Sequence, residues 1–334
     1  MKTGKNYKRI LLITLLITII FSILALCLGQ FSISLQDAKD ILLGNGNANQ
    51  QAKTVIFNIR LPRVILSIAA GAGLAVSGAA FQSLFANPLA TPDTLGTANG
   101  ASFGAVLGIL VGMNSFGVQL SSLAFGVIAV LIVYFVSKSS SKSSSMMMLI
   151  LSGLVVSSLF SALVSLVKYT ADPNDILPVI TYWLMGSFSS ITAQSLSLGL
   201  PLILAGIVVL YLLRHQMNVL SLSDDEAVSL GVNLEILRTL VVLAAAGITA
   251  SVVSMCGVIG WTGLLIPHIA RMVFGNNNSR VIPASIVFGG LFMLVTDTIA
   301  RCLTLSEIPV SILTAVIGAP VFILLLRRTG GIHV

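Results

Sequence analysis

Charged residues are scarce in this chain: they make up 9% of its 334 residues, whereas 56% are hydrophobic. Soluble globular domains carry about 25% charged residues. The mean hydropathy of +1.03 therefore excludes a soluble enzyme or a soluble nucleic-acid-binding domain. The chain also lacks the GxxxxGK[ST] pattern of a P-loop, so we do not expect it to bind a nucleotide in that way.

Cysteine is rare as well. Cys27, Cys256 and Cys302 lie in or beside apolar segments without CxxC spacing, and we interpret them as small buried residues. Accordingly, neither a cofactor nor a metal site is expected. Ionisable residues within the apolar segments are few, Asp297 being the clearest, although ion-coupled secondary transporters usually need such groups. This scarcity favours transport that a partner protein powers.

Long apolar segments, in contrast to charged residues and cysteines, are abundant and recur from Ile10 to Leu326. A segment of about 17–25 apolar residues can cross a bilayer as a helix. We therefore predict an all-α membrane protein, a polytopic bundle of about ten transmembrane helices forming a single domain over residues 1–334. The first segment is expected to stay as an uncleaved span rather than a signal peptide, and the eighth is short and contains Pro267. The expected spans are 9–29, 62–85, 94–112, 117–137, 146–168, 192–213, 239–256, 261–274, 281–302 and 308–326.

The basic residues are distributed unevenly around these spans. Twelve of the eighteen Lys and Arg residues fall on one side, which the positive-inside rule identifies as the cytoplasm. Both termini are predicted on that side, and the rule explains the net charge of +7 without nucleic acid. The six exceptions are Lys39, Lys53, Arg60, Arg63, Lys168 and Arg301.

Arg60 and Arg63 flank Pro62 at the predicted start of the second span. Proline suits a first helical turn, but cations there face the positive end of the helix dipole. Both arginines also lie on the side that the positive-inside rule leaves poor in cations. Arg301 ends the ninth span four residues after Asp297, a spacing that predicts an ion pair within the helix. Glu307, with Pro309, is expected to cap the last span.

The longest cytoplasmic loop, about 216–238, has the pattern of a capped helix. Ser223 and Glu226 form a capping box, Asp224 and Asp225 suit the first turn, and Gly231 suits the position after the helix. Asn233 could cap a second short helix that runs into the seventh span. From the residues alone, this segment is either a connector or a docking element for a soluble partner.

Six motifs now make the chain resemble one family. In order along residues 55 to 328 they are RLPR, SGAAFQSLFANPLATPDTLGTANGASFGA, EAVSLGVN, IGWTGLLIPHIAR, TDTIAR and EIPVSILTAVIGAPVFILLLRR. They resemble the FecCD family, the permease subunits of ABC importers for iron–siderophore complexes, haem and cobalamin. The resemblance implies ten helices per subunit and a dimer of permeases, homomeric or heteromeric. It also implies two cytoplasmic ATPases and an extracellular or periplasmic substrate-binding protein.

The resemblance also implies roles for particular residues. Residues Ser221–Arg238 match the family's coupling segment, which contacts the ATPase; the site residues expected there are Ser223, Asp224, Asp225, Glu226, Ala227 and Gly231. Arg60, Arg63 and Arg301 match positions that bind acidic residues on the two lobes of the binding protein.

The sequence thus predicts a multi-pass permease in the bacterial cell membrane. Its expected cargo is an iron(III)–siderophore, driven inward by ATP hydrolysis in a partner, and the chain itself catalyses nothing. Haem, cobalamin or an oxyanion are the alternative cargoes. From other classes, an ion-coupled secondary transporter would need ion sites within the membrane, and an intramembrane protease would need a nucleophile that the sequence does not indicate.

Overall fold

The computed structural model describes residues 2–31, 33–42, 50–138, 145–304 and 306–328, and every regular element within these is a helix. The described residues form fourteen α-helices, one π-helical segment, η1, and one 3-10 segment, η3. The first half of the chain comprises α1 (Lys2–Cys27), α2 (Leu35–Leu42), α3 (Gln50–Thr54), η1 (Val55–Arg60), α4 (Leu61–Leu84), α5 (Thr97–Leu110), α6 (Ser115–Lys138) and α7 (Ser145–Thr170). The second half comprises α8 (Ile176–Leu184), α9 (Ala193–Leu213), η3 (Gln216–Ser221), α10 (Asp224–Ser229), α11 (Leu234–Cys256), α12 (Thr262–Phe274), α13 (Asn278–Leu303) and α14 (Val310–Arg328).

The ten predicted spans are confirmed as helices. Seven helical segments are long and apolar enough to cross a membrane, and three shorter apolar helices match the remaining predicted spans. These three are α5, α12 and α14, of 14, 13 and 19 residues. The eighth predicted span is indeed short, with Pro267 inside α12.

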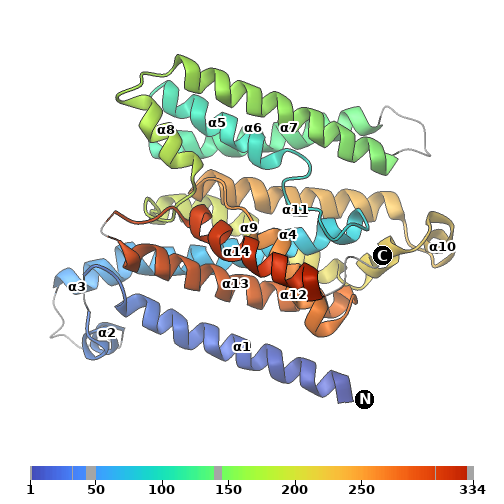
Figure 1. The fold of residues 1–334 in the computed structure, drawn as a ribbon, viewed down its shortest axis with the longest axis horizontal. Coiled ribbons are helices and arrows are strands. Elements are labelled where there is room, and N and C mark those ends of the chain that lie inside the picture. The colour runs from blue at the N-terminus through green and yellow to red at the C-terminus, as the bar shows by residue number, and fades with distance from the viewer. Residues whose placement is uncertain (1, 32, 43–49, 139–144, 305, 329–334) are drawn as a thin grey trace.

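The bundle has two ends (Figure 1). The short helices α2, α3 and α8 gather at one end, which we call the α8 end. Helix α10 projects from the opposite end, the α10 end, where α1 also begins. Helix α1 lies along one side of the bundle, packed mainly against α13, and leaves most of its large apolar side chains exposed. Such a face suits lipid, because lipid tails are as apolar as the side chains themselves.

Helix α4 is the centre of the bundle. Nearly all of its residues are buried, and it packs against α9, α11, α12 and α13. Small residues permit this: a Cβ atom at Gly71 would overlap the carbonyl of Gly289 on α13, and one at Gly78 would overlap the carbonyl of Gly263 on α12. Membrane helices gain stability from such close backbone approach. The α4, α12 and α13 backbones are therefore in direct contact.

The predicted start of the second span is wrong. The helix does not begin near Pro62 but at Gln50, and it continues through η1 into α4 as one 35-residue segment. Within η1 the backbone is wound more widely, and the Leu61 amide donates to the Ile56 carbonyl five residues back. Proline at 62 has no N–H and its ring clashes with the carbonyl four residues before it. This steric conflict favours a wider turn over an α turn, and the helix continues instead of ending.

Candidate functional sites

The first candidate site lies at the α8 end and consists of five charged residues: Arg60, Arg63, Asp297, Arg301 and Glu307. We call it the arginine–carboxylate network. The three arginines are only 4–5% exposed and Asp297 is fully buried. The sequence predicted Arg60 and Arg63 in a first helical turn. The premise is wrong because residues 50–59 extend the helix beyond them, so they do not face a free N-terminal dipole.

Arg63 on α4 is held by two carboxylates. Its Nη2 lies 2.8 Å from Asp297 Oδ1 on α13, and its Nε donates to both Asp297 oxygens at 2.9 and 3.1 Å. Its Nη1 lies 2.8 Å from Oε2 of Glu307, whose side chain is 28% exposed. Planar bidentate contacts of this kind are the strongest that a guanidinium makes. The network therefore ties α4, α13 and the start of α14 together.

The predicted ion pair between Asp297 and Arg301 is wrong. Asp297 is directed at α4, where Arg63 occupies it, and Arg301 makes no ion pair within 4.0 Å in the part of the chain that the structure describes. The Arg301 guanidinium instead donates to the carbonyl of Ala25 and, at 3.5 Å, to the hydroxyl of Thr298. A helical spacing allows two side chains to meet, but better-placed partners on neighbouring helices prevail here.

Arg60 and Arg301 together cap the end of α1. Arg60 Nη1 donates to the carbonyls of Leu26 at 2.7 Å and Cys27 at 3.0 Å, while its Nη2 donates to the carbonyl of Phe31. The last carbonyls of a helix have no partner within the helix, and a cation is favoured beside them. Gly29, at φ +143°, leaves the space that the Arg60 guanidinium fills. These arginines thus have internal partners that the sequence reasoning missed.

Glu307 was expected only to cap the last span. Helix α14 begins at Val310, and Glu307 reaches back to Arg63. Glu307 and Arg63 are 244 residues apart, so no local sequence pattern connects them. The one available signal was general: an arginine inside an apolar bundle needs a carboxylate partner.

The second candidate site is the α10 segment. Ser223 is the N-cap of α10, and the capping box with Glu226 is present as predicted. The Ser223 hydroxyl and amide donate to Glu226 Oε2 at 2.9 and 3.1 Å, and these bonds lower the pKa of the fully exposed Glu226. Gly231 follows the helix with φ +77°, the left-handed conformation that glycine adopts at no cost. The local reading of the sequence is confirmed here.

One detail of this prediction is wrong. No second short helix follows Asn233 in the described chain, because Asn233 is itself the N-cap of α11, accepting from the Ile236 amide at 3.1 Å. The seventh span therefore starts at Leu234, five residues earlier than predicted. Asp224 is fixed to this helix by a salt bridge of 2.7 Å to Arg238, whereas Asp225 is exposed and Ala227 is fully buried.

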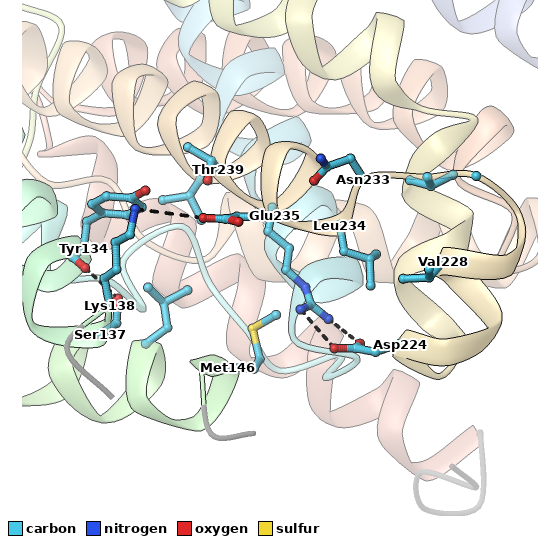
Figure 2. A pocket seen from close by; sticks show the side chains of 15 residues that line it. Tyr134, Ser137, Lys138, Met146, Asp224, Val228, Asn233, Leu234, Glu235 and Thr239 are labelled. Atoms are coloured by element: carbon cyan, nitrogen blue, oxygen red, sulfur yellow. Dashed lines mark hydrogen bonds and ion pairs between the residues drawn. The ribbon is translucent and has the colours of Figure 1, made fainter. Parts of the chain in front are cut away.

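A cavity of about 880 Å³ opens between α6, α7, α10 and α11 at this end (Figure 2). Asp224 and Val228 line it from α10, Leu234 and Glu235 from α11, and Lys138 from α6. Beside it the α10 segment exposes three large apolar side chains: Leu222 at 42%, Val228 at 64% and Leu230 at 62%. An apolar patch with a polar rim is typical of a protein contact surface.

Residues 15–328 match the FecCD transport family. The chain is 39% identical to the molybdate import permease MolB of Haemophilus influenzae over 321 residues, 95% of each chain. It is 36% identical to the Fe(3+)-citrate import permease YfmE of Bacillus subtilis over 332 residues, 98% of each chain.

The fold agrees with these relatives. The chain superposes with a TM-score of 0.88 and 38% identity on a solved ABC transporter, assigned to the metal-chelate type and in an inward-facing conformation. The match covers 96% of this chain and 99% of the solved one. This chain is therefore a multi-pass ABC importer permease, its ATPase a separate subunit, and it belongs to the FecCD transport family.

Proposed function

We propose that the chain is the permease of a bacterial importer that takes an iron(III) chelate, a siderophore complex, into the cytoplasm. Membership of the FecCD transport family carries this proposal, and relatives named for Fe(3+)-citrate and iron(3+)-hydroxamate import support the choice of cargo. In this assignment the α10 end faces the cytoplasm and the α8 end faces outward, with the protein in the cell membrane as a single permease domain.

We assign the α10 segment to the ATPase dimer. Its capping box and the Asp224–Arg238 salt bridge hold a short helix at the edge of the bundle, with apolar side chains directed away from it. A helix of six residues is marginal alone, so these contacts hold it in shape for a partner. The residues involved are Ser223, Asp224, Asp225, Glu226, Ala227 and Gly231.

Two further partners complete the proposed importer. A second permease, identical or homologous, packs against this one to form the path between the subunits. A substrate-binding protein delivers the cargo at the α8 end, and we assign its docking to Arg60, Arg63 and Arg301. Because their guanidinium groups have internal partners, an incoming carboxylate must share or replace those contacts. Glu307, the half-buried carboxylate and the most accessible residue of the network, is the contact that such a group would meet first.

Molybdate is the second candidate cargo, because a molybdate import permease is 39% identical over 95% of this chain. Proteoliposomes containing the permease, its ATPase and its binding protein distinguish the two. We expect ATP-dependent uptake of ferric siderophore, with molybdate uptake at background. Uptake of molybdate alone would transfer the assignment to the oxyanion. Uptake that an ion gradient drives without ATP would overturn the importer proposal itself.

A further inference from the structure

A polar cluster, buried only at Asn278 and Ser83, joins the segment before α10 to the centre of the bundle. It consists of Asn218 on η3, Asn277 and Asn278 at the start of α13, Ser83 on α4 and Arg271 on α12. We call it the asparagine cluster. Asn278 is 4% exposed and Ser83 is 8% exposed, and both lie among otherwise apolar helices. Buried polar groups are retained only where they are bonded, so the partners of each are informative.

The first half of the cluster fastens η3 to α13. Asn218 Oδ1 accepts from the backbone N–H of Asn278 at 2.7 Å, and Asn218 Nδ2 donates to Asn277 Oδ1 at 3.1 Å. Asn278 Nδ2 donates in return to the carbonyl of Met217 at 3.2 Å. Asn277 is the N-cap of α13, so these three bonds hold η3 against the first turn of that helix.

The second half continues from α13 to α4 and α12. The Ser83 hydroxyl lies 2.9 Å from Asn278 Oδ1, and it accepts from Arg271 Nη2 at 3.1 Å. Arg271 also donates to the Ala79 carbonyl of α4 at 3.3 Å. Both polar atoms of the Asn278 side chain are therefore bonded, Oδ1 to Ser83 of α4 and Nδ2 to Met217 of η3.

The two attachments of α10 differ in kind. One attachment is the salt bridge from Asp224, the first residue of α10, to Arg238 of α11, and the Asp224 side chain is 67% exposed. The other attachment is the chain itself: only Leu222 and Ser223 separate α10 from η3, and η3 is bonded to the asparagine cluster. That cluster contacts α4, α12 and α13, whose backbones touch at Gly71–Gly289 and Gly78–Gly263. A displacement of η3 must therefore move this close-packed unit or break buried hydrogen bonds.

We infer that Asn218 and Asn278 are the mechanical link through which the α10 segment moves α4, α12 and α13 during the ATPase cycle. The inference rests on the proposed assignment of α10 to the ATPase. Asn218 and Asn278 are positioning residues in this arrangement, since they act through the elements that they join. Packed interfaces of this kind shift as units rather than deform gradually, which makes such a link effective.

The test compares Asn218→Ala and Asn278→Asp with the wild type in proteoliposomes that contain the complete importer. Asn218→Ala removes a half-buried side chain, and Asn278→Asp keeps the shape but replaces the amide donor to Met217. Cargo taken up per ATP hydrolysed is the readout, alongside basal ATP hydrolysis and the thermal midpoint. We expect near-normal basal hydrolysis and an uptake per ATP that falls about fivefold or more, the scale of a typical coupling free energy.

Asn276→Ala is the matched control, because the Asn276 side chain is exposed and only its backbone carbonyl binds Arg271. It should behave as wild type. Wild-type uptake per ATP in both test variants would overturn the inference, as would a loss in proportion to a lower thermal midpoint. If the wild-type permease itself assembles with no ATPase, the proposed function fails rather than the link.

Discussion

Arg63 of α4 and Asp297 of α13, 234 residues apart in the chain, form a buried bidentate ion pair at the α8 end of the bundle. The pair joins the central helix to the helix that carries Arg301, and Glu307 supplies a second carboxylate from beyond α13. Two carboxylates around one guanidinium give the arginine a stable charged state where water is scarce. This contact is therefore a structural joint as well as a candidate surface for docking.

Removing one partner of this ion pair should be costly. Arg63→Met leaves Asp297 buried without its cation, and loss of one partner of a buried pair costs about 3–5 kcal/mol. We expect a clear fall in the thermal midpoint in detergent, and a smaller fall for the double variant Arg63→Met with Asp297→Leu. The single variant Asp297→Leu completes the comparison. If the thermal midpoint of the double variant falls by as much as the falls for Arg63→Met and Asp297→Leu added together, the two residues are not coupled.

The cap on α1 gives a second prediction. Arg60→Ala frees the carbonyls of Leu26 and Cys27, so amide hydrogen exchange should rise over residues 24–31 and change little in α4. Lys53→Ala is the control, since Lys53 is an exposed cation at the same end of the bundle. Unchanged exchange at the end of α1 in Arg60→Ala would contradict the capping role.

Docking of a binding protein can be tested without disturbing a buried arginine. Glu307→Gln removes the half-buried negative charge that shares Arg63, while Asp297 still balances the guanidinium. If Arg63 receives a carboxylate of the binding protein, affinity in nanodiscs should rise a few-fold, and the gain should shrink at high salt. Equal or weaker binding at both salt concentrations would show that Arg63 is only a structural residue.

The backbone conformation of Gly231 gives a prediction about coupling between the permease and the ATPase. Its φ of +77° is inaccessible to proline, whose ring fixes φ near −65°. We expect Gly231→Pro to insert normally but to lose the ATP hydrolysis that the loaded binding protein stimulates. Asn tolerates the left-handed region, and a Cβ at this position meets no atom within 4 Å, so Gly231→Asn should retain activity. Full stimulation of ATP hydrolysis in Gly231→Pro would contradict the assignment of α10 to the ATPase.

Close backbone contact at α4 gives the fifth prediction. A Cβ at Gly78 overlaps the carbonyl of Gly263, so Gly78→Ala should cost about 1–3 kcal/mol of stability through overpacking. Gly247→Ala on α11 is the control, because no atom lies within 4 Å of its added Cβ. The thermal midpoint should fall for Gly78→Ala alone, and equal midpoints would show that α4 and α12 can separate without cost.

Local patterns predicted local structure well. The apolar segments placed every span, and the Ser223–Glu226 box and Gly231 gave the limits of α10, because capping depends on residues within one turn. Contacts between distant helices were not accessible in this way. Nothing near Arg63 in the chain indicates that Asp297 and Glu307 will surround it, and nothing near Asn278 indicates Asn218. The misplaced start of the second span has a local cause: Pro62 was read as a helix start, whereas η1 lets the helix pass through it.

The wide turns of η1 have a consequence for sequence length. An α-helix advances about 100° per residue, so deletion of one residue from 55–60 that restored α turns would rotate everything before it by that angle. Ala52 and Ile56 would then leave the small core that they form with Cys27, Ile33, Ala38 and Ile41. Side-chain substitutions in η1 can be neutral while a single-residue deletion is not. The packing of α3 against this core thus depends on the number of residues in η1, and homologues should vary less in the length of η1 than in its exposed side chains.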